Sequence, residues 1–98
     1  MSLIVNEADQ IVKLRAEEYG EPVRYFTGLE MMEKILRDYA DGSPHHVPGA
    51  LSVLQKIALK LMRLAYDPTH KDSLLDLKGY TKILEECVKH GKTKYFRF

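Results

Sequence analysis

The sequence predicts an all-α protein, a compact four-helix domain with a short basic-aromatic C-terminal tail. Two observations lead to this fold class. In four successive segments apolar residues recur at the three- and four-residue spacings of an amphipathic helix, and glycine or proline separates the segments. No segment shows the alternating pattern of a β-strand, with the tail KTKYFRF as the one place where a strand stays open.

Length and composition bound the protein class. The 98 residues suit a single domain, residues 1–98, with 92–98 as its tail. The net charge of +1 creates no global field that would steer the chain to nucleic acid or to a membrane. Cys87 is the only cysteine, which excludes an internal disulfide and fits a reducing compartment. Without a membrane-spanning run or a basic leader, we expect a cytoplasmic protein. A chain this short buries a modest share of its surface, so a homo-oligomer is also expected.

The first two helices are bounded by start and stop signals. Asn6 followed by Asp9 resembles a helix-start box, and Gly20 with Pro22 ends the first apolar pattern. The loop DGSPHHVPG, residues 41–49, contains two glycines and two prolines and ends the second helix. The expected apolar side of that second helix consists of Phe26, Leu29, Met32, Leu36 and Tyr39.

Residues 50–66 predict the central helix, because apolar side chains cover about half of its circumference at 100° per residue. Its basic side chains, Lys56, Lys60 and Arg63, recur at spacings of four and three and cluster on the remaining side. The dipeptide at 67–68, Asp-Pro, ends this helix. Since that turn is short, the helices on either side of it should be antiparallel neighbours.

The fourth helix is expected to begin at a second start box, Thr69 with Asp72, and to stop at Gly91. Asp76 lies on the border of its apolar side, one turn after Asp72. Gly79 costs roughly 1 kcal/mol relative to alanine in a helix interior, which is tolerable if another backbone or a ligand approaches there. The apolar side itself consists of Leu74, Leu77, Tyr80, Leu84, Cys87 and Val88.

These placements bring two cations and two acids together between the last two helices. A partly buried carboxylate costs several kcal/mol unless a charge or several donors meet it. We therefore expect Lys60 and Arg63 to meet Asp72 and Asp76 in one polar layer. That layer is either a structural ion-pair cluster or a site whose cations bind phosphate. In the second case the acids orient the cations, hold a divalent cation such as Mg²⁺ or accept hydrogen bonds from ribose hydroxyls. His70 is expected to orient or cap the turn.

Two segments carry a resemblance to a known family. RAEEYGEP at 15–22 and LKLMRLAYDPTHKDSLLDLKGY at 59–80 follow the patterns R-x-x-x-YG-x-P and LK-x-x-RL…NP-x-H-x-DS-x-x-D-x-x-GY. These patterns resemble a family of short phage and prophage proteins that is itself a domain of unknown function. The chain departs from the family at Asp67, where asparagine is usual, and at Glu33, where an aromatic residue is expected.

The resemblance implies a helical fold, a phage context and a set of motif positions: Arg15, Tyr19, Gly20, Lys60, Arg63, His70, Asp72, Ser73, Asp76, Gly79 and Tyr80. More distantly, the helical pattern is similar to nucleotide-modification-associated domains and to MazG-like nucleotide pyrophosphohydrolases. We therefore expect a phage-type protein that binds a nucleotide or nucleotide-derived signalling molecule, with sequestration of that molecule as one outcome. Lys60 and Arg63 would contact phosphate, and Tyr19 and Tyr80 would wall the pocket. The expected ligand-binding residues are Lys60, Arg63, Asp72, Asp76, Tyr80, Tyr19, Arg15 and His70, with Asp72 and Asp76 also as metal ligands.

Two alternatives stay open. MazG-like hydrolases hold magnesium with E-x-x-E on one helix and E-x-x-D on the next, and this chain has Glu30 and Glu33 at the first spacing without the second. A magnesium-dependent nucleoside triphosphate pyrophosphohydrolase is therefore one alternative. The other is a protein-interaction module in which the ion-pair cluster is purely structural. In such a module the exposed surface or the tail would engage a host protein. Independently of this, the tail, residues 92–98, is expected either to pack on its own domain or to dock on a neighbouring subunit.

Overall fold

The computed structural model describes residues 3–93, which form four helices: α1 (Leu3–Tyr19), α2 (Pro22–Ala40), α3 (Ala50–Tyr66) and α4 (Lys71–Thr93). Residues 3–93 contain no strand, so the predicted all-α class is confirmed. Within that range, no helix has the length and hydropathy to cross a membrane. Residues 94–98, which carry most of the predicted tail, lie outside the described part of the chain.

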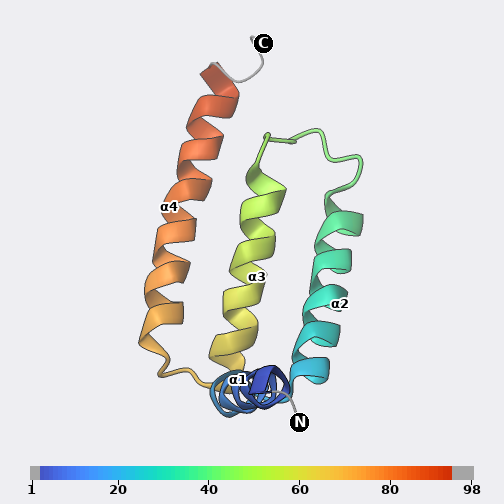
Figure 1. Cartoon of the computed structure of the whole chain (residues 1–98). Helices are drawn as coiled ribbons and strands as arrows, with labels where there is room; N and C mark the ends of the chain where they lie inside the picture. The colour runs from blue at the N-terminus through green and yellow to red at the C-terminus, as the bar shows by residue number, and fades with distance from the viewer. Residues whose placement is uncertain (1–2, 94–98) are drawn as a thin grey trace.

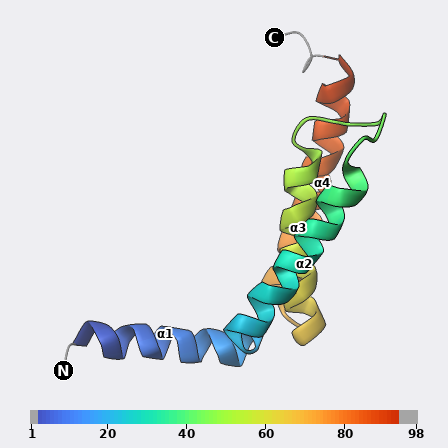
Figure 2. The ribbon, with the colours of Figure 1, turned by 90° about the vertical axis from the view of Figure 1, so that its right-hand side faces the viewer.

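Helices α2, α3 and α4 lie side by side in one layer, with α3 in the middle (Figure 1). Seen along the plane of that layer, the three helices overlap, and α1 projects away from one side (Figure 2). Only the C-terminal end of α1 reaches the layer (Figure 2). The lower end of the layer is therefore the place where all four helices meet.

The turn between α1 and α2 is built around a glycine and a capping acid. Gly20 has a φ of 90°, and its N–H donates to the carbonyl of Ala16 at 2.8 Å. Glu21 then caps α2, since its carboxylate accepts the N–H groups of Val23 at 3.0 Å and Arg24 at 2.9 Å. The predicted end of α1 is confirmed.

The predicted start of α1 is wrong, because residues from Leu3 onward are already helical and Asn6 lies inside the helix. The start box competes here with a preceding apolar stretch that contains neither glycine nor proline and so continues the helix.

The buried side of α2 differs from the predicted one. Tyr25 and Leu29 are each 7% exposed, whereas Phe26 is 59% exposed and Tyr39 is 91% exposed. A stripe at four- and three-residue spacing that begins at Tyr25 faces α3, and Phe26 lies about 100° away from it. Both registers are compatible with the sequence pattern, and the position of α3 selects the first.

Helix α3 has the predicted bounds but contacts neighbours on two sides. Ala58 and Lys60 are both buried, at 2% and 7% exposure, although they lie about 200° apart on the helix. Met62, one turn after Ala58, packs against α2 so closely that a Cβ on Gly28 would come within 2.7 Å of its Cε. A helix flanked on both sides buries two opposite faces, and one of these faces contains a lysine.

Helix α4 continues past the predicted stop at Gly91 to Thr93. Gly91 is buried, and a Cβ there would come within 2.9 Å of Cγ1 of Val47 in the loop 41–49. It also lacks the positive φ that a C-terminal glycine cap needs. This glycine therefore makes room for the loop and does not end the helix.

Candidate functional site

A cluster of polar and aromatic side chains lies at the end of the layer where the four helices meet. We divide this polar cluster into two halves by the contacts described below. The α4 half contains Glu18, Lys60, His70, Ser73 and Asp76. The tyrosine half contains Tyr19, Tyr25 and Arg63.

The turn that leads into α4 is held by an aspartate. Oδ1 of Asp67 accepts hydrogen bonds from the N–H of Thr69 at 3.0 Å and from its hydroxyl at 2.6 Å. These two hydrogen bonds lower the pKa of the Asp67 carboxyl. Thr69 is thereby engaged with Asp67, and the predicted start box with Asp72 does not form. Asparagine offers the same side-chain oxygen, which explains how aspartate can replace it here.

His70 caps α4, as its position before the helix suggested. Its Nδ1 accepts the backbone N–H of Ser73 at 3.2 Å and lies 2.8 Å from the Ser73 hydroxyl oxygen. Its Nε2 lies 2.7 Å from Oε1 of Glu18. Because Nδ1 accepts, the hydrogen-bond pattern assigns the ring proton to Nε2, which donates to Glu18. One imidazole thus joins the start of α4 to the end of α1.

The contact with His70 changes the acidity of Glu18. The hydrogen bond from His70, followed by one from Tyr19, lowers the pKa of the Glu18 carboxyl below its ordinary value of 4.5. The acid is therefore ionised at neutral pH and anchors α1 on the layer.

Lys60 and Asp76 form the predicted ion pair. Nζ of Lys60 lies 2.8 Å from Oδ2 of Asp76, with the lysine side chain 9% exposed and the aspartate 48% exposed. The hydrogen bond from Lys60 lowers the pKa of Asp76. A buried ammonium is tolerable only with such a partner, so this pair compensates the charge that α3 presents to α4.

Asp72 does not join the layer. It is exposed in the first turn of α4, and no other side chain in the described part of the chain forms a hydrogen bond or ion pair with it. Ser73, one residue later, is fully buried and faces the layer, which turns Asp72 about 100° away. Near a helix N-terminus, Asp72 has a favourable interaction with the helix dipole instead.

Arg63 also departs from the predicted layer. Its guanidinium carbon lies 4.2 Å from the centroid of the Tyr19 ring, and its Nε donates to the Tyr25 hydroxyl at 3.2 Å. The Tyr19 and Tyr25 rings stack with centroids 6.3 Å apart. Burial, followed by the hydrogen bond with Glu18, raises the pKa of Tyr19, so the ring under the cation is neutral.

The geometry of α3 explains this separation of the two cations. Three residues correspond to about 300° on a helix, so Arg63 lies about 60° away from Lys60, towards the side from which α1 projects. No carboxylate in residues 7–91, where side chains are described, is within ion-pair distance of Arg63. Two tyrosine side chains, and not two acids, orient this guanidinium.

Two hollows border the tyrosine half, and both include Tyr19, Gly20 and Tyr25 in their walls. The smaller, of about 100 Å³, is also lined by Arg15 and Arg63. The larger, of about 320 Å³, has further walls from Glu21, Arg24, Met62, Ala65 and Tyr66. Arg15 and Arg63, both expected ligand residues, therefore line one hollow, and Tyr66 adds a third tyrosine nearby.

Tyr80 and Gly79 lie elsewhere. Tyr80 is half-buried one turn beyond Asp76 and lines neither hollow of the tyrosine half, so it does not wall a pocket with Tyr19 there. Gly79 is exposed, and no described atom outside its own helix lies within 4 Å of the position a Cβ would take. The chain itself does not make the close approach expected at Gly79.

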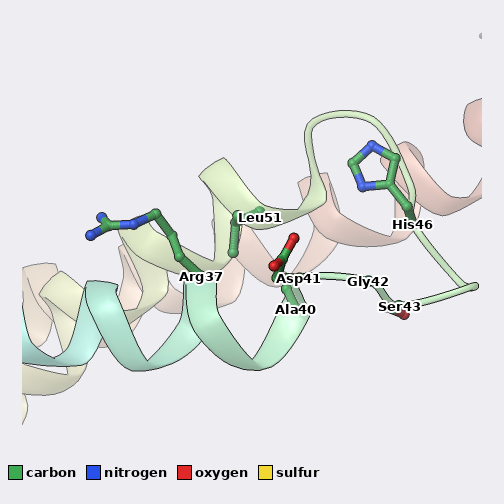
Figure 3. Close-up of a pocket in the computed structure, with 7 residues that line it drawn as sticks. All are labelled: Arg37, Ala40, Asp41, Gly42, Ser43, His46 and Leu51. Atoms are coloured by element: carbon green, nitrogen blue, oxygen red, sulfur yellow. The ribbon is translucent and has the colours of Figure 1, made fainter.

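A third hollow, of about 360 Å³, lies at the opposite end of the layer. It is lined by Arg37, Ala40, Asp41, Gly42, Ser43, His46 and Leu51. Figure 3 shows that Arg37 points along α2, away from Asp41, and that His46 stands apart on the loop. Its polar side chains do not converge on one point, as those of the polar cluster do.

The expected magnesium ligands do not come together. Among the described side chains, no group of three or more His, Cys, Asp and Glu residues is placed to hold a metal ion. Asp76 is engaged by Lys60, and Asp72 points away from it.

Three members of the cluster had no site role in the sequence analysis. Tyr25 could have been found from its four-residue spacing to Leu29, and Glu18 from its place beside Tyr19 in the motif RAEEYGEP. Ser73 is a motif position, but the sequence gives no reason to expect a hydroxyl at the most buried point of α4.

Comparison with known proteins supplies a family. No curated protein and no solved structure matches the chain. One family model matches residues 3–88, a range that contains the whole polar cluster and both hollows of the tyrosine half. The chain therefore belongs to the family described as "Domain of unknown function (DUF6378)".

Proposed function

We propose that the protein binds a nucleotide or a nucleotide-derived molecule at the tyrosine half, with a phosphate on Arg63. The observation that supports this most is the state of that arginine. Its guanidinium is oriented by Tyr19 and Tyr25, and of its five N–H donors only the one on Nε has a partner among the described residues. The remaining donors form the fork that suits a phosphate group.

Arg15 supports the same assignment. It lines the hollow of about 100 Å³ together with Arg63, so two arginines border one small space. Lys60, the other expected phosphate contact, is 9% exposed and engaged by Asp76. We therefore assign Lys60 the indirect role of holding α3 and α4 together beneath the site.

The base or another apolar part of the ligand would occupy the adjoining hollow. Its volume of about 320 Å³ lies at the lower end of the usual range for ligand pockets, about 300–1,000 Å³. Tyr66 lines it alongside Tyr19 and Tyr25. Aromatic side chains stack on bases of any sequence, and each such contact contributes about 1–3 kcal/mol.

The biological setting follows from the resemblance of the motifs to phage and prophage proteins. In an infected bacterial cytoplasm, tight binding without turnover would sequester a host signalling nucleotide. A magnesium-dependent pyrophosphohydrolase has no comparable support, since the described acids do not gather into a metal site.

The test is ligand-dependent thermal unfolding of the full chain with ATP, GTP, cyclic AMP and cyclic GMP, each with and without magnesium. A ligand at 100 times its Kd stabilises the folded state by about 2.7 kcal/mol, which raises the unfolding midpoint by several degrees in a domain of this size. Arg63→Met should weaken binding about tenfold or more, because it removes a charge-assisted hydrogen bond.

The matched control is Lys56→Met. Lys56 is exposed on the same helix, two turns before Arg63, and its replacement removes the same charge outside the cluster. Circular dichroism establishes that both variants fold. If no nucleotide raises the midpoint, or if Arg63→Met binds like Lys56→Met, the tyrosine half is not a nucleotide site. The polar cluster is then structural, as in a protein-interaction module.

A further inference from the structure

The described structure is a single layer, and it leaves much apolar surface uncovered. Helical domains ordinarily bury their core between two layers. Here only three apolar side chains in the described region are buried: Tyr25, Leu29 and Ala58. The chain exposes 7884 Å², against about 5,700 Å² for a compact protein of its mass of 11.3 kDa. Its radius of gyration is 17.2 Å, against about 13 Å for a compact domain of this length.

The middle helix shows which side of the layer is uncovered. One side of α3 carries Lys56 and Arg63, and since Arg63 lies over Tyr19, this is the side from which α1 projects (Figure 2). The opposite side contains no charged residue along the whole helix. It carries Leu54, Ile57 and Leu61.

The two outer helices extend this side with further apolar residues, and on α4 the same stripe also contains Lys78 and Glu85, one charge of each sign. Both outer helices run antiparallel to α3 (Figure 1). Each has a second apolar stripe next to its buried one, and helical geometry places this second stripe on the same side of the layer as Leu61. On α2 the exposed fractions of Met31, Ile35 and Tyr39 are 62%, 64% and 91%. We call the following residues the apolar face: Met31, Ile35, Tyr39, Leu61, Leu74 and Val88.

We propose that a second copy of this chain covers the apolar face, so that two layers pack back to back around a shared core. The chain exposes on the order of 2,000 Å² more than a compact monomer. The projecting helix α1 accounts for part of this excess, and the uncovered side of the layer accounts for another part (Figure 2). An interface of standard size needs only about 800 Å² from each copy. The face carries no charge along α3, and Lys78 and Glu85 on its α4 part have opposite signs, so no excess of one charge keeps two copies apart. In such a dimer α1 and the hollow lined by Arg15 and Arg63 lie on the outer sides, whereas the larger hollow, which Ala65 lines one turn after Leu61, borders the interface.

The first experiment measures mass. Sedimentation equilibrium of the full chain should give about twice the 11.3 kDa of one copy. Ile35→Lys places a charge on the α2 part of the face in both copies and should weaken dimerisation at least 100-fold. Leu75→Lys is the matched control, because Leu75 is 68% exposed on the outer side of α4 and Ile35 is 64% exposed. That variant should stay dimeric.

A second variant covers the case in which the Ile35→Lys chain does not fold. Tyr39 is 91% exposed in the single chain, so Tyr39→Ser costs a monomer little, within about 0.5 kcal/mol. In a dimer it should weaken association and lower a thermal midpoint that rises with protein concentration. A folded monomeric wild type overturns the proposal, and so does a dimer that tolerates both changes or that Leu75→Lys disrupts equally.

Discussion

The two halves of the polar cluster use similar residues in different ways. In the α4 half each polar group meets a partner: Lys60 meets Asp76, and His70 meets both Ser73 and Glu18. In the tyrosine half Arg63 makes one hydrogen bond among the described residues, lies over an aromatic ring and lines a hollow. Two cations three residues apart on one helix thus have different roles, and the neighbouring helix that each one faces decides which.

The largest effect should come from the most buried point of the α4 half. Ser73 is 0% exposed, and leucine there adds volume to a closed contact and removes the hydroxyl that meets His70. Ser73→Leu should lower the free energy of unfolding by about 1–3 kcal/mol, measured by urea titration. Ser73→Ala, which removes the hydroxyl alone, should lose only about 1 kcal/mol. Equal losses in both variants would show that the α4 half has unfilled space.

A smaller and asymmetric effect is expected at the ion pair. Asp76→Asn leaves a buried ammonium without its anion and should destabilise the fold. Lys60→Met leaves only a half-exposed acid and should lie within about 1 kcal/mol of the wild type. Urea unfolding of both variants and of the double variant measures the coupling. If Asp76→Asn were as stable as Lys60→Met, the pair would not hold the α4 half together.

Acid titration tests the contribution of the Lys60–Asp76 pair to the free energy of unfolding. The folded-state pKa of Asp76 lies below its ordinary value of 3.8, because Lys60 donates to the carboxylate. Its stabilising contribution is therefore complete above about pH 5 and is lost progressively as the pH falls through 3.8 and then through the folded-state pKa. The Asp76→Asn variant should lose less stability than the wild type over that acid range.

The smallest effect concerns the exposed side of α4. At Gly79 nothing described lies within 4 Å of the position that a Cβ would take, so alanine fits and favours the helix. Gly79→Ala should raise the free energy of unfolding by about 0.5–1 kcal/mol and leave nucleotide-dependent stabilisation unchanged. If stability rises while the ligand effect disappears, the ligand lies against α4 and not at the tyrosine half.

Much of the fold follows from local sequence signals. Apolar spacing and the stop signals at Gly20 and 67–68 were enough to predict four helices, and the short turn before α4 was enough to predict the Lys60–Asp76 pair. Which side of each helix is buried could not be predicted from local signals. Tyr25 and Phe26 fit the pattern equally well, and only the position of α3 buries the first.

The errors in the site have a related cause. A hydrophobic pattern shows how wide an apolar side is but not that a middle helix has two neighbours. The polar layer with Lys60 was predicted, but the second buried face of α3 to which Lys60 belongs was not. The start of α4 depends on whether Thr69 pairs with Asp67 or with Asp72, two choices of similar local energy. The partner of Arg63 depends on where α1 lies, which the turn at Gly20 determines.

That turn also sets a mechanical property of the molecule. Seventeen residues of helix extend about 25 Å from Gly20, and the far end of this rod has no support from the layer (Figure 2). A rotation of about 10° at the turn would displace the tip by about 4 Å, given the rise of a helix per residue. Tyr19, which immediately precedes the turn, is also the ring beneath Arg63. A small displacement of the Tyr19 ring by a bound molecule would therefore produce a much larger displacement at the N-terminal end of α1.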